Sequence, residues 1–400
     1  MTARCLITTL ALPKCDIREN VEQLAGLLTQ CPALAHLDLR SNTIPQEGAC
    51  ELAEVLGQCS ALAHLNLGDN SIGDLGTGRL AGVLAKCASL AHLDLSKNAI
   101  GFATLENIEG VLAQCTALTH LNLSKNYIGN RRAESFAALG RCKALVHLDL
   151  GYNLISEAAA ESLGGVLGQC TALAHLNLRY NRIENAGAGW IARALPQCSA
   201  LTHLDLAQNH FHVFSTGLLA GVLAQCPALA YFDLSDNNIG SAGTQSLASI
   251  LPQCPVLADL RLHTNRIGPE GATSLAEVIA QCRALTRLDL DDNNIKSTGA
   301  QNFASVLAQC PLLAHLNLSD NKIEADGAGS LAEVLTQCTA LTHIDLSWNL
   351  IRKAGAESLA GVLGQCTVLV SLHLDVNSIP DVSKRRLRDS WRGQPDRLFL

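Results

Sequence analysis

The chain has 400 residues, a formal net charge of −7 and only 16% charged residues, whereas 48% of its residues are hydrophobic. This composition excludes an intrinsically disordered chain, and the lack of a basic excess argues against nucleic-acid binding. No apolar run approaches the ~18 residues that would suggest a membrane span. We therefore expect a packed protein with no nucleic acid and no membrane among its partners.

Residues 1–30 hold the first copy of a spacing that runs through the whole chain. Ile7, Leu10, Leu12 and Ile17 are separated as the apolar residues are in every later copy, with Cys15 where the later copies have asparagine. The segment weakly resembles a signal peptide, with one Arg before a short apolar stretch. The match to the repeat favours a degenerate first repeat that acts as an N-terminal cap.

Residues 31–379 contain thirteen further copies of the spacing Cys-x-x-Leu-x-x-Leu-x-Leu-x-x-Asn-x-Ile. The step between asparagines is 28 residues throughout, except for one step of 27 between Asn126 and Asn153. A fixed period of this length indicates a repeat architecture and overrides the two or three domains that the length would otherwise suggest. These asparagines, here called the asparagine row, are Asn42, Asn70, Asn98, Asn126, Asn153, Asn181, Asn209, Asn237, Asn265, Asn293, Asn321, Asn349 and Asn377.

Each copy predicts a short strand followed by a helix. The alternation x-Leu-x-Leu has the period of a strand. After the Ile, small or apolar residues follow at helical spacing, for example Ala272, Leu275, Ala276 and Ile279, and a glycine such as Gly271 is expected to open the helix. Parallel strands require a crossover of this kind. The sequence therefore predicts an α/β solenoid of about 14 strand–helix repeats.

Residues 380–400 are expected to form a C-terminal capping helix and a basic tail. Pro380 follows the last repeat, and Leu387 and Trp391 keep the helical spacing. A solenoid needs a polar element of this kind over its last repeat. The cluster SKRRLR is interpreted as a solvated face of this helix, with a nuclear import signal as the alternative.

The pattern LxxLxLxxNxI, with a 28-residue period and a full helix in each repeat, resembles the ribonuclease-inhibitor-type leucine-rich repeats. It is also similar to the C-terminal arrays of NOD-like receptors and to the Ran GTPase-activating protein. The resemblance implies a right-handed horseshoe with the parallel sheet on the concave side and the helices on the convex side. It further implies a non-catalytic protein-binding scaffold, such as an enzyme inhibitor or an innate-immune or signalling receptor module. The alternative is activation of a small GTPase, although that family typically has an acidic C-terminal tail.

Thirteen of the sixteen cysteines occur once per repeat, eleven residues before each asparagine. An odd number without CxxC pairs fits neither a disulfide framework nor a metal site. A small buried hydrophobic residue explains such a row. Reduced thiols in this number indicate the cytoplasm, with the nucleus as a second possibility. No metal and no cofactor is expected.

The two variable positions of the strand lie on one face, which we expect to be the exposed concave face. The first is His in nine copies and the second is mostly Asp or Asn. A polar ladder, metal capture by adjacent imidazoles and catalysis are the alternatives for this face. His343, Asp345 and Ser347 share it, but Asp lies between the other two, whereas a catalytic triad needs His in the middle. We expect no enzymatic activity.

The variable positions also predict where a partner binds. Exposed aromatic residues among charges are typical of interface anchors, and the later repeats turn acidic, with only Arg261 and Arg287 opposing. The sequence thus predicts a monomer that binds one protein, possibly basic, in its concave face. The predicted contact residues are Tyr152, Tyr180, Asp236, Asp289, Asp291, Asp292, Asp320, Asp345 and Trp348, accompanied by Asp233 and Asp375. Val213 and Phe214, in the unusual loop HFHVFSTG, are expected either to pack inward or to form a contact patch on the rim.

Overall fold

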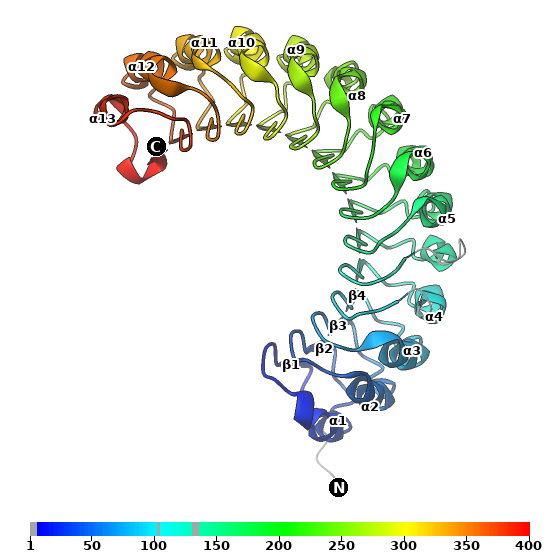
Figure 1. Cartoon of the computed structure of the whole chain (residues 1–400). Coiled ribbons are helices and arrows are strands. Elements are labelled where there is room, and N and C mark those ends of the chain that lie inside the picture. The colour runs from blue at the N-terminus through cyan, green and yellow to red at the C-terminus, as the bar shows by residue number, and fades with distance from the viewer. Residues whose placement is uncertain (1–5, 102–104, 130–135) are drawn as a thin grey trace. The chain divides into compact units, whose positions relative to one another are not determined.

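The computed structural model describes residues 6–101, 105–129 and 136–400. The chain divides into two compact units, residues 1–204 and 205–400, and each is described by itself. In both units every repeat contributes one short strand, and neighbouring strands are parallel and follow chain order from β1 to β15. The predicted α/β solenoid of strand–helix repeats is therefore confirmed (Figure 1).

In unit 1 the helices lie on one side of the strands and form one layer (Figure 1). Short 3-10 turns occupy Arg18–Asn20, Ala137–Arg141 and Leu195–Gln197, and the second of these falls in the repeat that is one residue shorter. The strands are β1 (Thr9–Ala11), β2 (His36–Asp38), β3 (His64–Asn66), β4 (His92–Asp94), β5 (His120–Asn122), β6 (His147–Asp149) and β7 (His175–Asn177), followed by β8 (His203–Asp205) at the boundary of the units. The helices are α1 (Val21–Leu28), α2 (Gln46–Leu56), α3 (Gly73–Leu84), α4 (Leu105–Gln114), α5 (Glu157–Leu167) and α6 (Glu184–Ala194).

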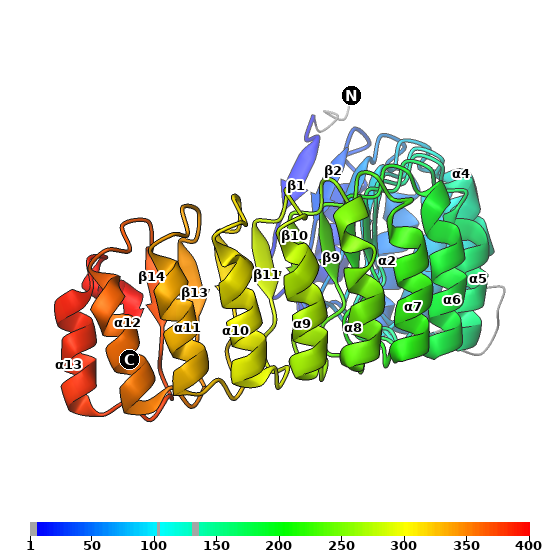
Figure 2. The same ribbon diagram turned by 90° about the horizontal axis from the view of Figure 1, so that it is seen from above.

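Unit 2 has the same construction, and Figure 2 shows its helices side by side. The strands are β9 (Tyr231–Asp233), β10 (Asp259–Arg261), β11 (Arg287–Asp289), β12 (His315–Asn317), β13 (His343–Asp345), β14 (Ser371–His373) and β15 (Leu398–Phe399). The helices are α7 (Val213–Leu223), α8 (Gly240–Ala248), α9 (Gly268–Ile279), α10 (Lys296–Leu307), α11 (Ala325–Leu335), α12 (Arg352–Leu363) and α13 (Asp381–Ser390), with 3-10 turns at Leu251–Gln253 and Pro395–Arg397.

The apolar positions of the repeat form the core of both units. In β12, for example, Leu316 is buried between the flanking His315 and Asn317, which are both half-buried. Leu275 and Ile279 of α9 are buried on the helix side. Because one repeat can bury this apolar surface only against its neighbours, these residues hold the stack together.

The asparagine row stabilises the loops after the strands. The side-chain oxygen of Asn126 accepts the N–H groups of Asn98 at 2.9 Å and Ile100 at 3.1 Å, both in the preceding repeat. Its side-chain nitrogen donates to the carbonyl oxygens of Leu95 at 3.0 Å and Leu123 at 2.9 Å. Each such amide therefore satisfies backbone groups of two repeats at once.

The glycine after each loop does not open the helix, contrary to the prediction. Helix α9 begins at Gly268, so Gly271 lies within its first turn. A Cβ on Gly271 would stand 2.6 Å from a methyl carbon of Ile267 and 3.1 Å from the backbone of Ser241 in the neighbouring helix. Close packing between helices of successive repeats, and not helix initiation, therefore requires glycine here.

The ends of the chain differ from the interior repeats. Ile7 lies at a position that is buried in the later repeats but is exposed here, beside β1, which is the edge strand of the sheet among the described residues. At the other end, α13 contains the buried Leu387 and ends before Trp391. Strand β15, which was not predicted, pairs with β14 and places the ring of Phe399 against His373 at a centroid distance of 4.1 Å.

The loops show an alternation between successive repeats that was also not predicted. Among the described loops, five asparagine-following residues donate their N–H to a carbonyl group in the repeat before: Ser71 to Ile44, Tyr127 to Ile100, Arg182 to Ile155, Asn238 to Phe211 and Leu350 to Ile323. The bond recurs at every second repeat from Ser71 to Asn238, and the next one, at Leu350, follows four repeats later. From Ser71 to Asn238, successive repeats are therefore paired through their loops.

Candidate protein-binding surface

The exposed face of the sheet, here called the strand face, carries a continuous stack of imidazole rings in unit 1. The rings of His36, His64, His92 and His120 follow one another at centroid distances of 4.1, 5.2 and 4.1 Å. Burial, followed by the charge of neighbouring imidazoles, lowers the pKa of His64 and His120. Burial and the like charge of neighbouring rings thus disfavour the protonated form of these two imidazoles within the ladder.

Asp and Asn alternate beside this stack in unit 1. In register, Asp38 faces Asn66, Asn66 faces Asp94, and Asp94 faces Asn122. The amide of Asn122 donates to the Asp94 carboxylate at 3.1 Å. Because adjacent carboxylates on parallel strands would repel each other, the alternation removes a like-charge contact between every pair of neighbours.

The arrangement at β13 is unlike that of a catalytic triad. The hydroxyl of Ser347 donates to Asp345 at 2.7 Å, and the Nδ1 atom of His343 lies 2.9 Å from the hydroxyl of Thr342. The imidazole therefore does not lie between Ser and Asp, as a general base would have to do.

The residues immediately before the asparagine row, here called the turn row, share an unusual backbone conformation. All of them have a positive φ, between 45° and 59°. Gly, Asn and Asp tolerate this left-handed region, whereas bulky or β-branched residues are rarely found there. The turn row consists of Ser41, Asp69, Lys97, Lys125, Tyr152 and Tyr180 in unit 1, and of Gln208, Asp236, Thr264, Asp292, Asp320, Trp348 and Val376 in unit 2.

In unit 1 the turn row contributes to an exposed tyrosine cluster. Tyr152 and Tyr180 stack at a centroid distance of 4.7 Å, and the Lys125 ammonium lies 5.6 Å from the Tyr152 ring. Together with Tyr127 and Leu154, they line a hollow of about 290 Å³. The sequence had indicated Tyr152 and Tyr180 but not Tyr127 or Leu154, which lie one residue after the asparagine of their repeats.

In unit 2 the turn row contains Trp348, whose side chain is 61% exposed. Its neighbours in the adjacent repeats are Asp320 and Val376, both exposed, and Asp292 follows one repeat further. The Trp348 N–H is fixed by the carbonyl group of Asp375 at 2.9 Å. The Trp348 indole is therefore largely in solvent, on a backbone conformation that disfavours a bulky residue. Two exposed carboxylates, of Asp292 and Asp320, lie on one side of it.

The acidic surface of unit 2 is smaller than the sequence predicted. Asp289 is only 8% exposed and Asp233 only 1%, so neither carboxylate is presented to solvent. Asp289 stands in register between Arg261 and Asn317 and accepts the N–H of Asp291 at 3.3 Å. Burial is the largest of several influences on the pKa of Asp289, and it raises that pKa. A position on the outer face of a strand can thus be covered by its neighbours.

The remaining predicted carboxylates make contacts within the surface. A carboxylate oxygen of Asp236 lies 3.7 Å from Nδ1 of His263, and one of Asp345 lies 4.0 Å from Nδ1 of His373. Asp291 is half-buried and accepts a hydrogen bond from the hydroxyl of Ser319. The exposed carboxylates among the predicted residues are therefore Asp292 and Asp320.

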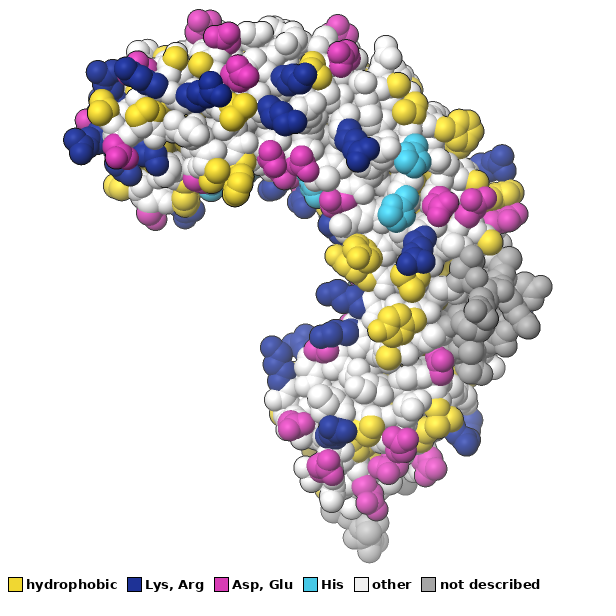
Figure 3. All heavy atoms as spheres, viewed as in Figure 1, with side chains coloured by type: hydrophobic (Ala, Val, Ile, Leu, Met, Phe, Trp, Pro, Cys, Tyr) yellow, Lys and Arg dark blue, Asp and Glu magenta, His cyan; other side chains and the backbone are white. Residues whose placement is uncertain are grey.

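The loop containing Val213 and Phe214 presents both side chains to solvent. Phe214 is 68% exposed and Val213 is 45% exposed, at the start of α7. The buried apolar residue of this loop is Phe211, which occupies the position of the usual Ile. Of the two expectations for the pair, inward packing is therefore wrong. The face drawn in Figure 3 shows hydrophobic side chains in separate groups among charged ones.

The cysteine row is buried between helix ends and strand starts, with Cys310 half-buried. In unit 1 the thiols reach carbonyl oxygens of the preceding repeat, as Cys142 does to Leu112 and Cys170 to Leu139, both at 3.3 Å. Burial raises the pKa of Cys142 to about 12 and that of Cys170 to about 11.

The histidines and carboxylates of the strand face do not assemble into a metal centre. Within residues 6–101, 105–129 and 136–400, no group of three or more His, Cys, Asp or Glu side chains is placed to hold a metal ion. Over the same part of the chain, every helix is too short or too polar to cross a bilayer.

Comparison with known proteins identifies the repeats. A family model described as Leucine Rich repeat matches residues 58–81, 114–137, 169–192, 225–248, 281–304, 309–332 and 337–360. These seven segments therefore match leucine-rich repeats. A comparison with curated protein sequences gave no match.

Solved structures show the same fold at low sequence identity. A leucine-rich repeat protein from Leptospira interrogans is 19% identical, with a TM-score of 0.54 over 97% of this chain and 95% of that one. The functional domain of InlJ from Listeria monocytogenes, which includes a cysteine ladder, is 17% identical, with a TM-score of 0.54 over 96% of this chain and 72% of that one. TLR13 in its complex with ssRNA13 is 20% identical, with a TM-score of 0.53 over 90% of this chain and 49% of that one.

Proposed function

We propose that the chain is a non-catalytic protein-binding scaffold and that unit 2 binds its partner through the turn row, with Trp348 as the anchor. The observation that carries this proposal is the combination of exposure and backbone conformation at Trp348. A bulky residue at φ 55° costs free energy that Asn or Gly would not, and most of the indole remains in solvent. Unexplained strain at an exposed aromatic residue is a feature of functional sites.

The charges around the anchor favour a partner with a basic surface. Asp292 and Asp320 occupy the two turn-row positions before Trp348 and are both exposed. Exposed carboxylates of this kind increase the association rate of a basic partner and add little to affinity. With two carboxylates presented and not eight, we expect a moderate dependence of the association rate on salt.

The scaffold is further assigned to the ribonuclease-inhibitor type of leucine-rich repeat, on the basis of its 28-residue period and the helix in each repeat. Its mode of action would be to cover a surface of the partner, as an inhibitor or a receptor module does. The cysteine row supports a reducing compartment, and therefore the cytoplasm, as the place of action.

The proposal is tested with a photo-crosslinking residue at position 348, and at the exposed Leu75 of α3 as a matched control. A partner captured from position 348 alone is then purified, and its affinity is measured for the wild type and for Trp348→Asn. We expect at least a ~30-fold loss of affinity, which corresponds to the ~2 kcal/mol typical of an anchor residue. Equal affinity of the two proteins, or equal capture at both positions, would place the site elsewhere.

A further inference from the structure

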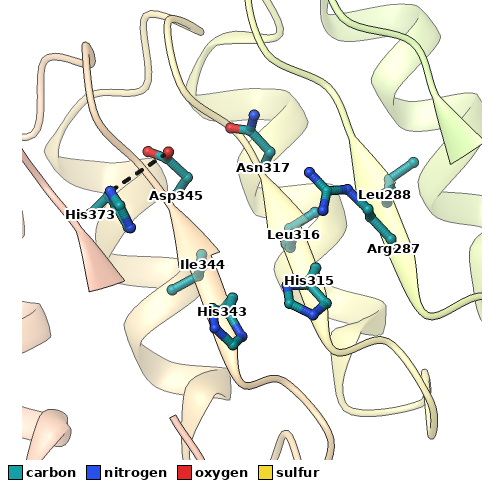
Figure 4. A pocket seen from close by; sticks show the side chains of 9 residues that line it. All are labelled: Arg287, Leu288, His315, Leu316, Asn317, His343, Ile344, Asp345 and His373. Atoms are coloured by element: carbon teal, nitrogen blue, oxygen red, sulfur yellow. Dashed lines mark ion pairs between the residues drawn. The ribbon is translucent and has the colours of Figure 1, made fainter. Parts of the chain in front are cut away.

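The strand face of unit 2 contains a pocket that neither the anchor nor the exposed carboxylates use. It measures about 150 Å³ and lies over β11, β12, β13 and β14. Figure 4 shows Arg287, His315 and His343 projecting from three neighbouring strands at its floor, with Asp345 and His373 beside them. The rings of His315 and His343 stack at a centroid distance of 4.3 Å.

Arg287 lacks the partner that its position on the sheet would supply. Its register neighbour on β10 is Asp259, but Arg261 holds that carboxylate with two hydrogen bonds, from Nε at 3.2 Å and from Nη2 at 3.0 Å. On the other side its neighbour is His315, which offers no negative charge. The Nε atom of Arg287 is buried without a hydrogen-bond partner. A buried guanidinium donor left unpaired costs free energy, so the side chain of Arg287 is not fixed by a carboxylate of the neighbouring strands.

The tautomer of His343 follows from its neighbour Thr342. The Thr342 hydroxyl donates to the carbonyl group of Ala314 at 3.0 Å, so it can only accept from Nδ1 of His343, 2.9 Å away. The neutral ring therefore carries its proton on Nδ1 and has a lone pair on Nε2. Nε2 becomes a donor only when the ring takes up a second proton.

The charged and titratable groups around the pocket influence whether His343 takes up this second proton. The pKa of His343 is lowered by burial first, then by His315, Arg397, His373 and Arg287. The pKa of His315 is lowered by burial and Arg287, and raised by Asp259. Asp345 is the carboxylate within the pocket, and its two oxygens face Ser347 and His373. The pocket thus has one permanent cation, Arg287, and burial and like charge disfavour a second proton on His315 and His343.

We propose that this pocket binds an oxyanion of the partner, a carboxylate or phosphorylated side chain, with Arg287 as the fixed cation and His343 taking up a proton from solvent at Nε2. This inference rests on the proposed function for the identity of the ligand as part of a protein. Arg is suited to this role because its planar donors match the oxygens of carboxylates and phosphates. The pocket would contact an acidic group of the partner, and the turn row after the strands would contact basic groups of the same partner.

The test follows the titration of individual imidazoles by NMR in the full chain. N-acetyl-L-glutamate and phenyl phosphate are the two probes, and sodium chloride at equal ionic strength is the reference. We expect a probe to move the midpoint of the His343 titration upward by about 0.5 pH unit or more, because a bound anion favours the charged ring. Response to one probe alone identifies the source as a carboxylate or a phosphorylated group. His64, in unit 1, should respond to ionic strength only.

Two substitutions decide the assignment. Arg287→Gln should abolish the response of His343, whereas Arg283→Gln, an exposed arginine four residues earlier, should leave it intact. Absence of a response to both probes, or an unchanged response in Arg287→Gln, would overturn the proposal. Trp348→Asn should keep the response of His343 while it loses partner binding, so failure of the pocket and failure of the anchor give different results.

Discussion

Asn321 and Asn349, in neighbouring repeats, are joined by a hydrogen bond from the backbone N–H of Asn321 to the side-chain oxygen of Asn349, at 3.0 Å. The same oxygen accepts the N–H of Ile323 at 2.8 Å. Each asparagine of the row thereby orders the loop of the repeat before it. The repeats are coupled through these buried amides as well as through apolar contact.

Asn321→Ala should destabilise unit 2 strongly. Asn321 is fully buried, and its side chain accepts the N–H groups of Asn293 and Ile295 and donates to the carbonyl group of Leu290. Unpaired buried groups cost ~1–3 kcal/mol each, so we expect a loss of ~3 kcal/mol or more. Urea unfolding measures this loss in the free energy of unfolding, and hydrogen exchange at the backbone N–H groups of Asn293 and Ile295 shows whether the loop opens locally. Asn302→Ala, which removes one half-buried bond to Thr273, is the control and should cost ~1 kcal/mol or less.

Trp348→Asn should stabilise the folded chain while it abolishes partner binding. Asn tolerates the left-handed backbone at this position, and the indole that it replaces is mostly in solvent. We expect a gain of ~1 kcal/mol in the free energy of unfolding, measured by urea denaturation. Thr264→Asn, three repeats earlier in the turn row, should give a similar gain with unchanged binding. A destabilised Trp348→Asn variant would mean that the indole contributes to packing.

Acid should loosen β3 to β6 before β9 to β11. Burial, followed by the charge of other imidazoles, lowers the pKa of His64, His120 and His147 in the folded state. A group whose pKa is lower when folded disfavours folding once it is protonated. Stability is therefore complete above the unfolded-state value of ~6.5 and falls as the pH decreases below it. Hydrogen exchange at pH 7.5 and 5.5, corrected for intrinsic rates, should show faster opening of β3 to β6.

Strands β9 to β11 serve as the internal reference, because Tyr231, Asp259 and Arg287 replace histidine at that position. His147→Gln should reduce the acid sensitivity of the strands around it. Equal acceleration of exchange in β3 to β6 and in β9 to β11 would show that the imidazole stack is not the cause.

The cysteine row should resist alkylation in the native state. The thiolate is the reactive form, and burial raises the pKa of Cys115, Cys142 and Cys170 to about 11, 12 and 11. Iodoacetamide at pH 8 should therefore modify the exposed Cys15 and leave these three unmodified, as read by mass spectrometry. After denaturation all sixteen cysteines should react. Native modification of Cys170 at the rate of Cys15 would contradict this account, as would disulfides in the folded, reduced protein.

The repeat fold could be predicted from the sequence because the apolar residues of each repeat follow the period of a strand and then that of a helix. The alternation around Leu316 marks a strand, and the spacing of Leu275 and Ile279 marks a helix. Strand β15 was missed because two residues are too few for any period, and their pairing with β14 depends on how the chain returns after α13.

The surface was less predictable, since exposure depends on side chains from neighbouring repeats. Asp289 occupies the same strand position as Asp345, yet it is buried between Arg261 and Asn317. Trp348 could be selected from the sequence because it is bulky where most copies have small or polar residues. The unpaired Nε of Arg287 could not, because it depends on the choice of Arg261 as the partner of Asp259.

The alternation of Asp and Asn beside the imidazole stack restricts how such a chain can change its length. Removal of a single repeat from β3 to β6 would bring two carboxylates, or two amides, into register, as Asp38 and Asp94 would be if the repeat of Asn66 were lost. Removal of two repeats restores both the Asp–Asn sequence and the alternating loops. A change of length that keeps this register therefore spans two repeats, which is 56 residues, or 55 where it includes the shorter repeat. Duplication or loss of two repeats would keep an Asp beside an Asn on every pair of neighbouring strands. A change by an odd number of repeats would leave one pair of strands with two Asp or two Asn side by side.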